Sequence, residues 1–181
     1  FAGYAEDSKV AAEFDITPFL HPGKNLIAFQ TFRWCDGSYS EDQDFWRLSG
    51  VARDCYLYSR SPKAHIDNLQ VTPNLDAQYR NGQLSVKVNM KGSAVFLFDI
   101  IDPQGNQLTR KAINASKVKS KNGGPAVLAH TLKIDVPNAQ KWTAETPNLY
   151  TLVATVKQGD REIESRPVKV GFRKIEIKDA Q

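Results

Sequence analysis

Three acidic residues lie within four positions of one polar segment: Glu41, Asp42 and Asp44. Two carboxyl groups held about 5–5.5 Å apart can cleave a glycosidic bond, because one donates a proton while the other attacks the anomeric carbon. That division of roles needs an apolar pocket that raises the pKa of one carboxyl group. The flanking residues are polar, so we expect this cluster to lie on a solvated loop and not to form a catalytic pair.

Aromatic and charged residues surround the acidic cluster. Trp34, Tyr39 and Trp46 could stack on the faces of sugar rings, but aromatic residues at strand and loop edges also serve as packing residues, and we favour packing. We expect Arg47, Arg53 and Asp54 to form ion pairs that hold this polar loop against a sheet.

The sulfur and imidazole groups indicate no metal or cofactor chemistry. Cys35 and Cys55 are too few for a disulfide framework and lack the spacing of a zinc site. Each lies in a predicted strand, which favours buried free thiols; one disulfide between neighbouring strands is the alternative. The three histidines, His21, His65 and His130, are far apart in the sequence, and no Ser/His/Asp order appears, so we expect no catalytic triad. The sequence also has no P-loop and no dinucleotide fingerprint, so we expect no cofactor for this chain.

The elements that must position these residues are strands. Short alternating runs bounded by Gly, Pro, Asn and Asp dominate the sequence, and no segment of about 11 or more residues has sustained helical spacing. The first part predicts strands over about 11–16, 26–34 and 51–58, with a short turn over Thr17–Leu20. Three strands are too few to close a sandwich, so they resemble one end of a larger β-domain.

The second part predicts seven strands at nearly regular spacing, which fits an immunoglobulin-like sandwich. In Leu84–Met90 the alternation is clean, and the strand that begins at Tyr150 carries apolar residues on both faces. The predicted ranges are 64–72, 83–90, 95–101, 107–113, 126–136, 150–157 and 162–177. The fold class predicted is therefore all-β.

Charge divides the chain at the same place. Residues 1–60 hold 6 Lys/Arg and 9 Asp/Glu, a net charge of −3, whereas residues 61–181 hold 18 and 11, a net charge of +7. Ser59–Lys63 is the expected linker, since Pro62 interrupts strand pairing. The densest basic stretch, Arg110–Lys121, has no aromatic residue for base stacking, so we expect a solvated basic loop and no nucleic-acid partner. No apolar run approaches the roughly 18–20 residues of a membrane span.

Several segments match a known family. Residues 33–54, with the sequence RWCDGSYSEDQDFWRLSGVARD, resemble a signature of β-galactosidases of glycoside hydrolase family 2. Tyr4–Asn25 resembles the part of the same domain that precedes this signature. Trp142–Tyr150 resembles the turn before a late strand of the family's immunoglobulin-like domain, and Val170–Ile177 resembles the strand that leads to its catalytic barrel.

The resemblance implies a layout. Residues 1–60 would be the C-terminal part of a galactose-binding-like jelly-roll, residues 61–178 an immunoglobulin-like domain, and residues 179–181 the start of a link to a (β/α)₈ barrel. The chain would then be an internal fragment of a β-galactosidase. The family's nucleophile and acid/base are glutamates of the barrel, so the resemblance implies no catalytic residue and no hydrolase activity for this chain alone.

The resemblance also implies a contact site and partners. Asp44 aligns with an aspartate that, in the parent enzyme, helps to bind a sodium ion and the galactosyl 6-hydroxyl; magnesium is a further candidate metal of the parent. The partners would be a β-galactoside substrate and the barrel of the same polypeptide, and the truncated jelly-roll strands would be free to self-associate. The alternatives are a stand-alone carbohydrate-binding β-sandwich module and a structural, adhesion-type immunoglobulin-like protein.

Overall fold

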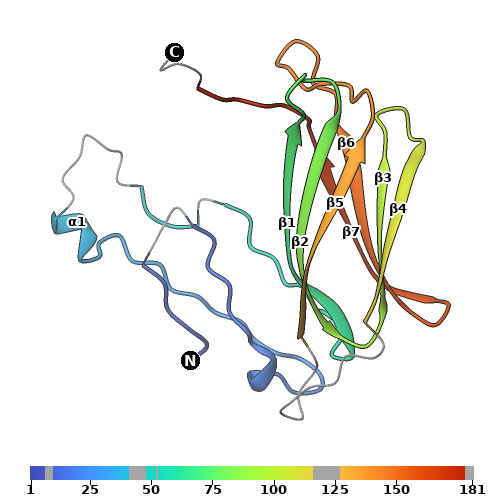
Figure 1. The fold of residues 1–181 in the computed structure, drawn as a ribbon. Coiled ribbons are helices and arrows are strands. Elements are labelled where there is room, and N and C mark those ends of the chain that lie inside the picture. The colour runs from blue at the N-terminus through green and yellow to red at the C-terminus, as the bar shows by residue number, and fades with distance from the viewer. Residues whose placement is uncertain (7–9, 41–47, 52, 116–126, 178–181) are drawn as a thin grey trace. The chain divides into compact units, whose positions relative to one another are not determined.

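The chain divides into two compact units in a computed structural model that describes residues 1–6, 10–40, 48–51, 53–115 and 127–177. The first unit is Phe1–Leu57 and the second is Tyr58–Gln181. All seven strands of the described residues lie in the second unit, and every strand pair is antiparallel (Figure 1). The predicted all-β class is confirmed.

The second unit is a two-layer sandwich. One sheet has the strand order β1-β2-β5 and the other has the order β4-β3-β6-β7. The strands are β1 (Ala64–Leu75), β2 (Gly82–Gly92), β3 (Val95–Ile101), β4 (Gln107–Asn114), β5 (Val127–Val136), β6 (Tyr150–Gln158) and β7 (Arg161–Val170). All seven predicted strands are present. The last one ends at Val170 and not at residue 177, because the chain leaves the sheet there and Phe172 turns into the end of the sandwich.

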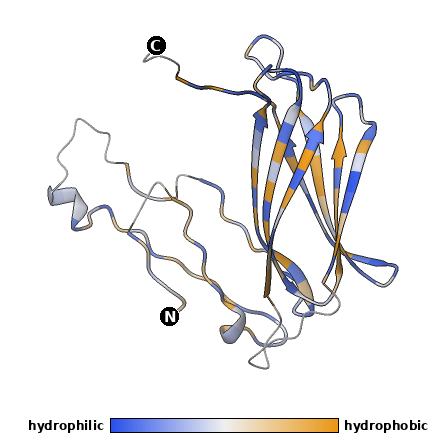
Figure 2. Ribbon diagram, viewed as in Figure 1, coloured by the Kyte–Doolittle hydropathy of each residue, from blue (hydrophilic) through white to orange (hydrophobic). Residues whose placement is uncertain are grey.

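The core of the sandwich follows the sequence pattern. The alternate residues of β2 predicted to share one face, Leu84, Val86, Val88 and Met90, are all buried. In β6 the inward residues are buried, and on the opposite face Thr155 is buried too, which confirms that this strand is covered on both faces. Figure 2 shows the resulting alternation of apolar and polar residues along the strands. Each large side chain buried in this way contributes about 1.5–3 kcal/mol to stability.

Two side chains of β7 bind the backbone of β1 at the edge of the sandwich. The Ile66 amide donates to Glu164 Oε2 at 3.0 Å, and Arg166 Nη2 donates to the Ile66 carbonyl at 2.6 Å. Glu164 and Arg166 are themselves paired. Because β1 and β7 belong to different sheets, these side chains satisfy backbone groups that would otherwise be unpaired at a strand edge.

The first unit has little regular structure in its described residues. It contains a 3₁₀ turn, η1 (Thr17–Phe19), and a single-turn helix, α1 (Gly37–Ser40). The turn predicted over Thr17–Leu20 is confirmed, and Asp15 Oδ1 accepts the Thr17 amide at 2.9 Å. The strands predicted over 11–16, 26–34 and 51–58 are wrong for the described residues, which form no ladder there. A strand needs a hydrogen-bonded neighbour, and no described residue of this unit is buried.

Candidate functional site

The first half of the signature segment forms a tight turn that ends directly before the acidic cluster. The Ser38 amide donates to the Cys35 carbonyl at 3.0 Å, and the Cys35 amide donates to Ser38 Oγ at 3.1 Å. The Tyr39 amide donates to the Asp36 carbonyl at 3.2 Å. A serine hydroxyl that bonds to nearby backbone groups favours turns of this kind, so local sequence accounts for α1.

Aromatic groups gather on this turn. The Trp34 and Tyr39 ring centroids are 6.4 Å apart and tilted by 36°, and the Arg33 guanidinium lies 5.1 Å from the Trp34 ring centroid. Trp34 is 49% exposed and Tyr39 is 81% exposed. The packing that we favoured from the sequence is limited to contact between the two rings, and neither residue belongs to a core, since both present surface to solvent. Rings that combine an apolar face with a polar tip are suited to contacts with sugars.

The predicted contact residue itself lies outside the described residues. Asp44 falls in the gap at 41–47, as do Glu41, Asp42, Trp46 and Arg47, so the structure gives no geometry for the predicted sugar and sodium contacts.

Two further expectations for the signature segment fail. Arg53 and Asp54 form no ion pair with any residue that the structure describes. Both cysteines are free; Cys35 is half-buried and Cys55 is exposed. The buried thiols expected from the sequence depended on strands that do not form. Within the described ranges, no group of three or more His, Cys, Asp or Glu residues could hold a metal ion.

One arginine of the predicted basic loop lies on a strand, within the range 107–113 that the sequence also predicts as a strand. Arg110 lies on β4 and forms a bidentate pair with Asp99 of β3, with Nε–Oδ1 at 2.6 Å and Nη2–Oδ2 at 2.9 Å. Asp99 is only 8% exposed, and Gln107 donates to it as well. The Asp99 carboxylate raises the pKa of Arg110 by hydrogen bonding and by its charge. For Arg110 the solvated-loop prediction is wrong, because a cross-strand carboxylate binds it.

The end of the sandwich where the chain leaves is closely packed. Trp142 and Pro147 form an isolated antiparallel bridge within the segment predicted to turn, and the Trp142 amide donates to the Phe172 carbonyl at 3.0 Å. Phe172 is buried, and its ring meets the Tyr150 ring edge-on with centroids 5.1 Å apart. A Cβ atom on Gly82 would lie 2.8 Å from the Phe172 ring, so only glycine fits beneath it.

Charged residues hold the following segment in place. Arg173 lies over the Trp142 ring at 5.0 Å from its centroid, and Lys174 lies 5.3 Å from the centroid of the Tyr79 ring. Lys174 also pairs with Glu176 at 2.9 Å, and the Tyr79 hydroxyl donates to Glu176. These contacts fix the direction in which residues 171–177 leave the sandwich. The sequence, which predicted a continuous strand there, gave no sign of them.

No helix within the described residues is long and apolar enough to cross a membrane.

Comparison with protein families gives two adjoining matches. Residues 64–173 match the family described as glycosyl hydrolases family 2. Residues 1–61 match the family described as glycosyl hydrolases family 2, sugar binding domain. The first match corresponds to the immunoglobulin-like sandwich of the second unit.

Curated relatives are similar along the whole chain. A β-galactosidase of Photobacterium profundum is 39% identical over 186 residues, which cover 100% of this chain and 18% of the relative. β-Galactosidases of Priestia megaterium and Vibrio vulnificus are 39% and 40% identical over 187 and 186 residues, and each is again covered over 18% of its length. The chain therefore spans less than one fifth of the curated relatives it matches.

Solved structures agree in fold. An FMN-binding β-glucuronidase from Facaelibacterium prausnitzii is similar over 75% of this chain and 20% of its own, with a TM-score of 0.55 and 23% identity. A β-glucuronidase from Parabacteroides merdae is similar over 65% of this chain and 14% of its own, with a TM-score of 0.50 and 22% identity. These structures show the fold alone, whereas the family match over residues 64–173 covers more than half of the chain and shows that it belongs to glycosyl hydrolases family 2.

Proposed function

We propose that the chain supplies the sugar-binding and immunoglobulin-like parts of a β-galactosidase. The observation that carries this proposal is the identity of 39–40% to β-galactosidases along essentially all of the chain. The two family matches, to a sugar-binding domain and then to a second family 2 domain, support the same order of parts. The boundaries proposed are 1–60 for the jelly-roll part and 61–178 for the immunoglobulin-like domain, with 179–181 beginning the link to a barrel.

The reaction proposed for the whole enzyme is hydrolysis of terminal β-D-galactosides with retention of configuration. Such a reaction needs two carboxyl groups about 5–5.5 Å apart on either side of the glycosidic bond. Among the described residues the most buried carboxylate, Asp99, is bound by Arg110 and Gln107, which makes it a structural group. Because the family resemblance puts both catalytic glutamates in the barrel, we assign them to residues outside this chain and expect the chain alone to show no turnover.

Asp44 is proposed to contact the galactosyl group of the substrate. A carboxylate accepts hydrogen bonds from sugar hydroxyls, and its oxygen is the class of ligand that hard cations prefer. The sodium site itself is a poor fit to this chain alone, because a single carboxylate is no site and the described residues offer no acidic cluster that would complete it. The remaining ligands would come from the barrel, and no step of the reaction is assigned to the ion.

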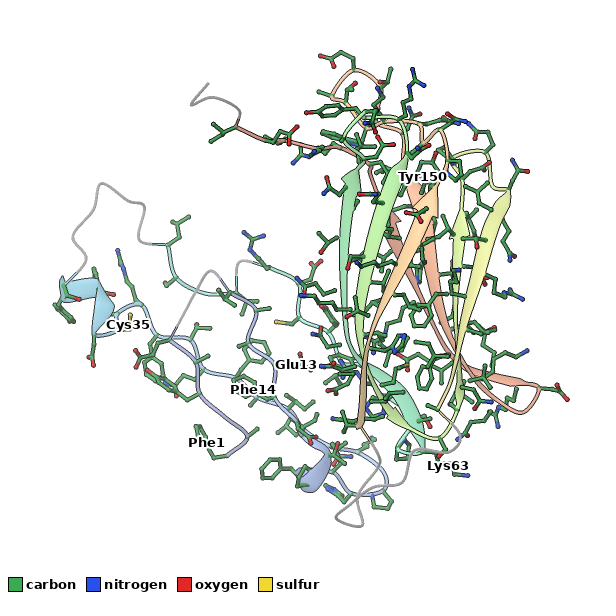
Figure 3. The ribbon with its side chains drawn as sticks, in the orientation of Figure 1. Phe1, Glu13, Phe14, Cys35, Lys63 and Tyr150 are labelled. Atoms are coloured by element: carbon green, nitrogen blue, oxygen red, sulfur yellow. The ribbon has the colours of Figure 1, made fainter. Side chains whose placement is uncertain are left out.

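The immunoglobulin-like domain is proposed to support the barrel. Within the second unit, Lys63 lies at one end of the sandwich and Tyr150 lies at the other, where the chain leaves (Figure 3). The contacts of Phe172, Arg173 and Lys174 fix the departing segment to the domain. A sandwich with a fixed point of departure is suited to hold the following domain in one orientation.

The test compares the complete enzyme with variants of two nearby aspartates, Asp44 and Asp42. Asp44→Asn should lower kcat/KM on a chromogenic β-galactoside by about 10- to 100-fold, since a hydrogen bond to a charged group contributes about 1.5–3 kcal/mol. Asp42→Asn, two positions away, is the matched control and should change kcat/KM by less than about 3-fold. The loss in Asp44→Asn should be accompanied by weaker dependence on sodium. Equal losses in both variants would refute the role of Asp44.

The chain alone provides a second test. It should not hydrolyse the same galactoside, and titration with galactose should leave its tryptophan fluorescence unchanged at millimolar ligand. Turnover by the isolated chain would overturn the assignment of catalysis to other residues. Saturable binding below millimolar ligand would instead favour a stand-alone carbohydrate-binding module, to which the exposed Trp34 and Tyr39 rings would contribute.

A further inference from the structure

We propose that Tyr58–Lys63, the segment that leads into the immunoglobulin-like sandwich, is an ordered strap fixed to that sandwich, with Asp67 as its anchor. This inference concerns the second unit alone and does not depend on the proposed activity. The composition of Tyr58–Lys63, with two serines and a proline, is typical of a flexible linker. Its contacts with β1 and β2 indicate the opposite behaviour.

The anchor is a β-bulge in the edge strand. The register of β1 against β2 shifts between Ile66 and Asn68, which leaves Asp67 as the extra residue. A bulge frees the backbone carbonyl of the extra residue and redirects its side chain. At Asp67 the strap uses both groups, since Arg60 Nη1 donates to the Asp67 carbonyl at 3.3 Å and lies 3.5 Å from Asp67 Oδ1.

Asp67 also contacts one residue of β2 and one of β1. Lys91 Nζ lies 2.9 Å from Asp67 Oδ1, and His65 Nε2 lies 3.9 Å from the same atom. The hydrogen bond from Lys91 lowers the pKa of Asp67 despite partial burial of the carboxyl group. The carboxylate thus joins one cation of the strap to one cation of the sheet, and its removal would leave Arg60 and Lys91 as neighbouring like charges.

Two further contacts add to the anchor at Asp67: one joins the strap to β1, and the other lies within the strap. The His65 ring approaches the Ser61 carbonyl through Nδ1 at 2.8 Å; because a carbonyl only accepts, Nδ1 carries the proton. The Arg60 guanidinium also lies 4.9 Å from the centroid of the Tyr58 ring and donates to the Tyr58 hydroxyl at 3.3 Å. Arg60 therefore links the start of the strap to the bulge.

The backbone of the strap's last residue sits directly on the sheet. Gly92 has φ +81°, and a Cβ atom there would lie 1.8 Å from the Lys63 carbonyl oxygen and 2.8 Å from the Ala64 Cα. Only glycine tolerates both the backbone conformation and this approach. The end of β2 is thus shaped to receive the strap. If the strap is ordered, the chain can change direction toward residues 1–57 only before Tyr58.

The experiment measures backbone amide order parameters by NMR relaxation in the full 181-residue chain. In the unchanged protein, the amides of Ser59, Arg60, Ser61 and Lys63 should have order parameters of about 0.85, like the strands, whereas a flexible linker has values below about 0.6. Asp67→Ala should bring the strap below about 0.6 and leave β3 and β6 unchanged. The control is Asp135→Ala, which removes an exposed carboxylate from β5.

A second variant keeps the test decisive if Asp67→Ala does not fold. Arg60→Ala removes the anchor from the strap side and leaves the sheet residues intact; Arg161→Ala, at the exposed start of β7, is its control. Strap amides that are already mobile in the unchanged protein would overturn the proposal. So would strap amides that stay ordered in a folded Asp67→Ala or Arg60→Ala variant.

Discussion

Truncation of Phe172 to alanine tests whether the departing segment is part of the folded domain. Phe172 is 0% exposed although it follows the last strand. Removing a buried phenylalanine side chain costs about 3–5 kcal/mol, because apolar burial is lost and a cavity remains. The edge-on contact with Tyr150, about 0.5–1.5 kcal/mol, is included in that loss. We therefore expect the free energy of unfolding of the sandwich to fall by about 3–5 kcal/mol.

The assay is urea unfolding followed by the circular dichroism of the strands. With a slope of about 2 kcal/mol per molar urea, the expected loss shifts the midpoint by about 2 M. The matched control is Ile175→Ala in the same segment, where the side chain is 80% exposed and the expected change stays within about 0.5 kcal/mol. Equal midpoints for the two variants would refute the reasoning, since Phe172 would then carry no more packing energy than an exposed residue.

The other predictions concern charge and thiol chemistry. Arg110→Ala should destabilise the sandwich by about 1–3 kcal/mol in urea unfolding, because it leaves the buried Asp99 carboxylate with only a weak partner. Hydrogen bonds from the Asn106 side chain and from nearby backbone amides lower the pKa of Asp102. The stability that Asp102 contributes is therefore present above its unfolded pKa of about 3.9 and is lost as pH falls through its folded pKa. Asp102→Asn should therefore flatten the acid limb of a midpoint-against-pH curve. Cys55 should react with a thiol reagent faster than Cys35, as mass spectrometry of labelled peptides would reveal.

Controls for these predictions come from neighbouring residues. Lys111→Ala, one position along β4, should cost less than about 0.5 kcal/mol, and an equal cost for Arg110→Ala would contradict the role of the Asp99 pair. An acid limb that keeps its slope in Asp102→Asn would argue against the contribution of this carboxylate. Equal labelling rates for Cys35 and Cys55 would show that the difference in their exposure does not control their reactivity.

The sandwich was predictable because its determinants are local. The alternation of Leu84–Met90 and the Trp142–Pro147 turn each lie within ten residues of sequence, and both formed as expected. A period of two combined with turn residues at regular spacing leaves few alternatives to a strand. The end of the last strand was missed because Phe172 packs against Tyr150 and Gly82, contacts that no local pattern encodes.

The first unit illustrates what a local pattern leaves out. Residues 26–34 have the composition of a strand, yet Leu26 is 95% exposed and the segment forms no strand ladder among the described residues. Strand composition becomes a strand only when a neighbour supplies hydrogen bonds and a surface to cover. The same reason explains the failed expectation of buried thiols. The ion pairs of Asp67 with Lys91 and of Asp99 with Arg110 were not predicted. They depend on strand register, which the sequence alone does not fix.

The contact between Ile66 and the Glu164–Arg166 pair has a consequence for the time course of synthesis. The hydrogen bonds join residues 98 and 100 positions apart, although β1 itself pairs with the adjacent β2. On a ribosome that adds about 5–20 residues per second, β1 would emerge roughly 5–20 s before the two side chains that bind its edge. During this interval the nascent β1–β2 hairpin exposes an unpaired edge to other chains. Completion of β7 ends that exposure, so β7 protects a strand made about 100 residues earlier.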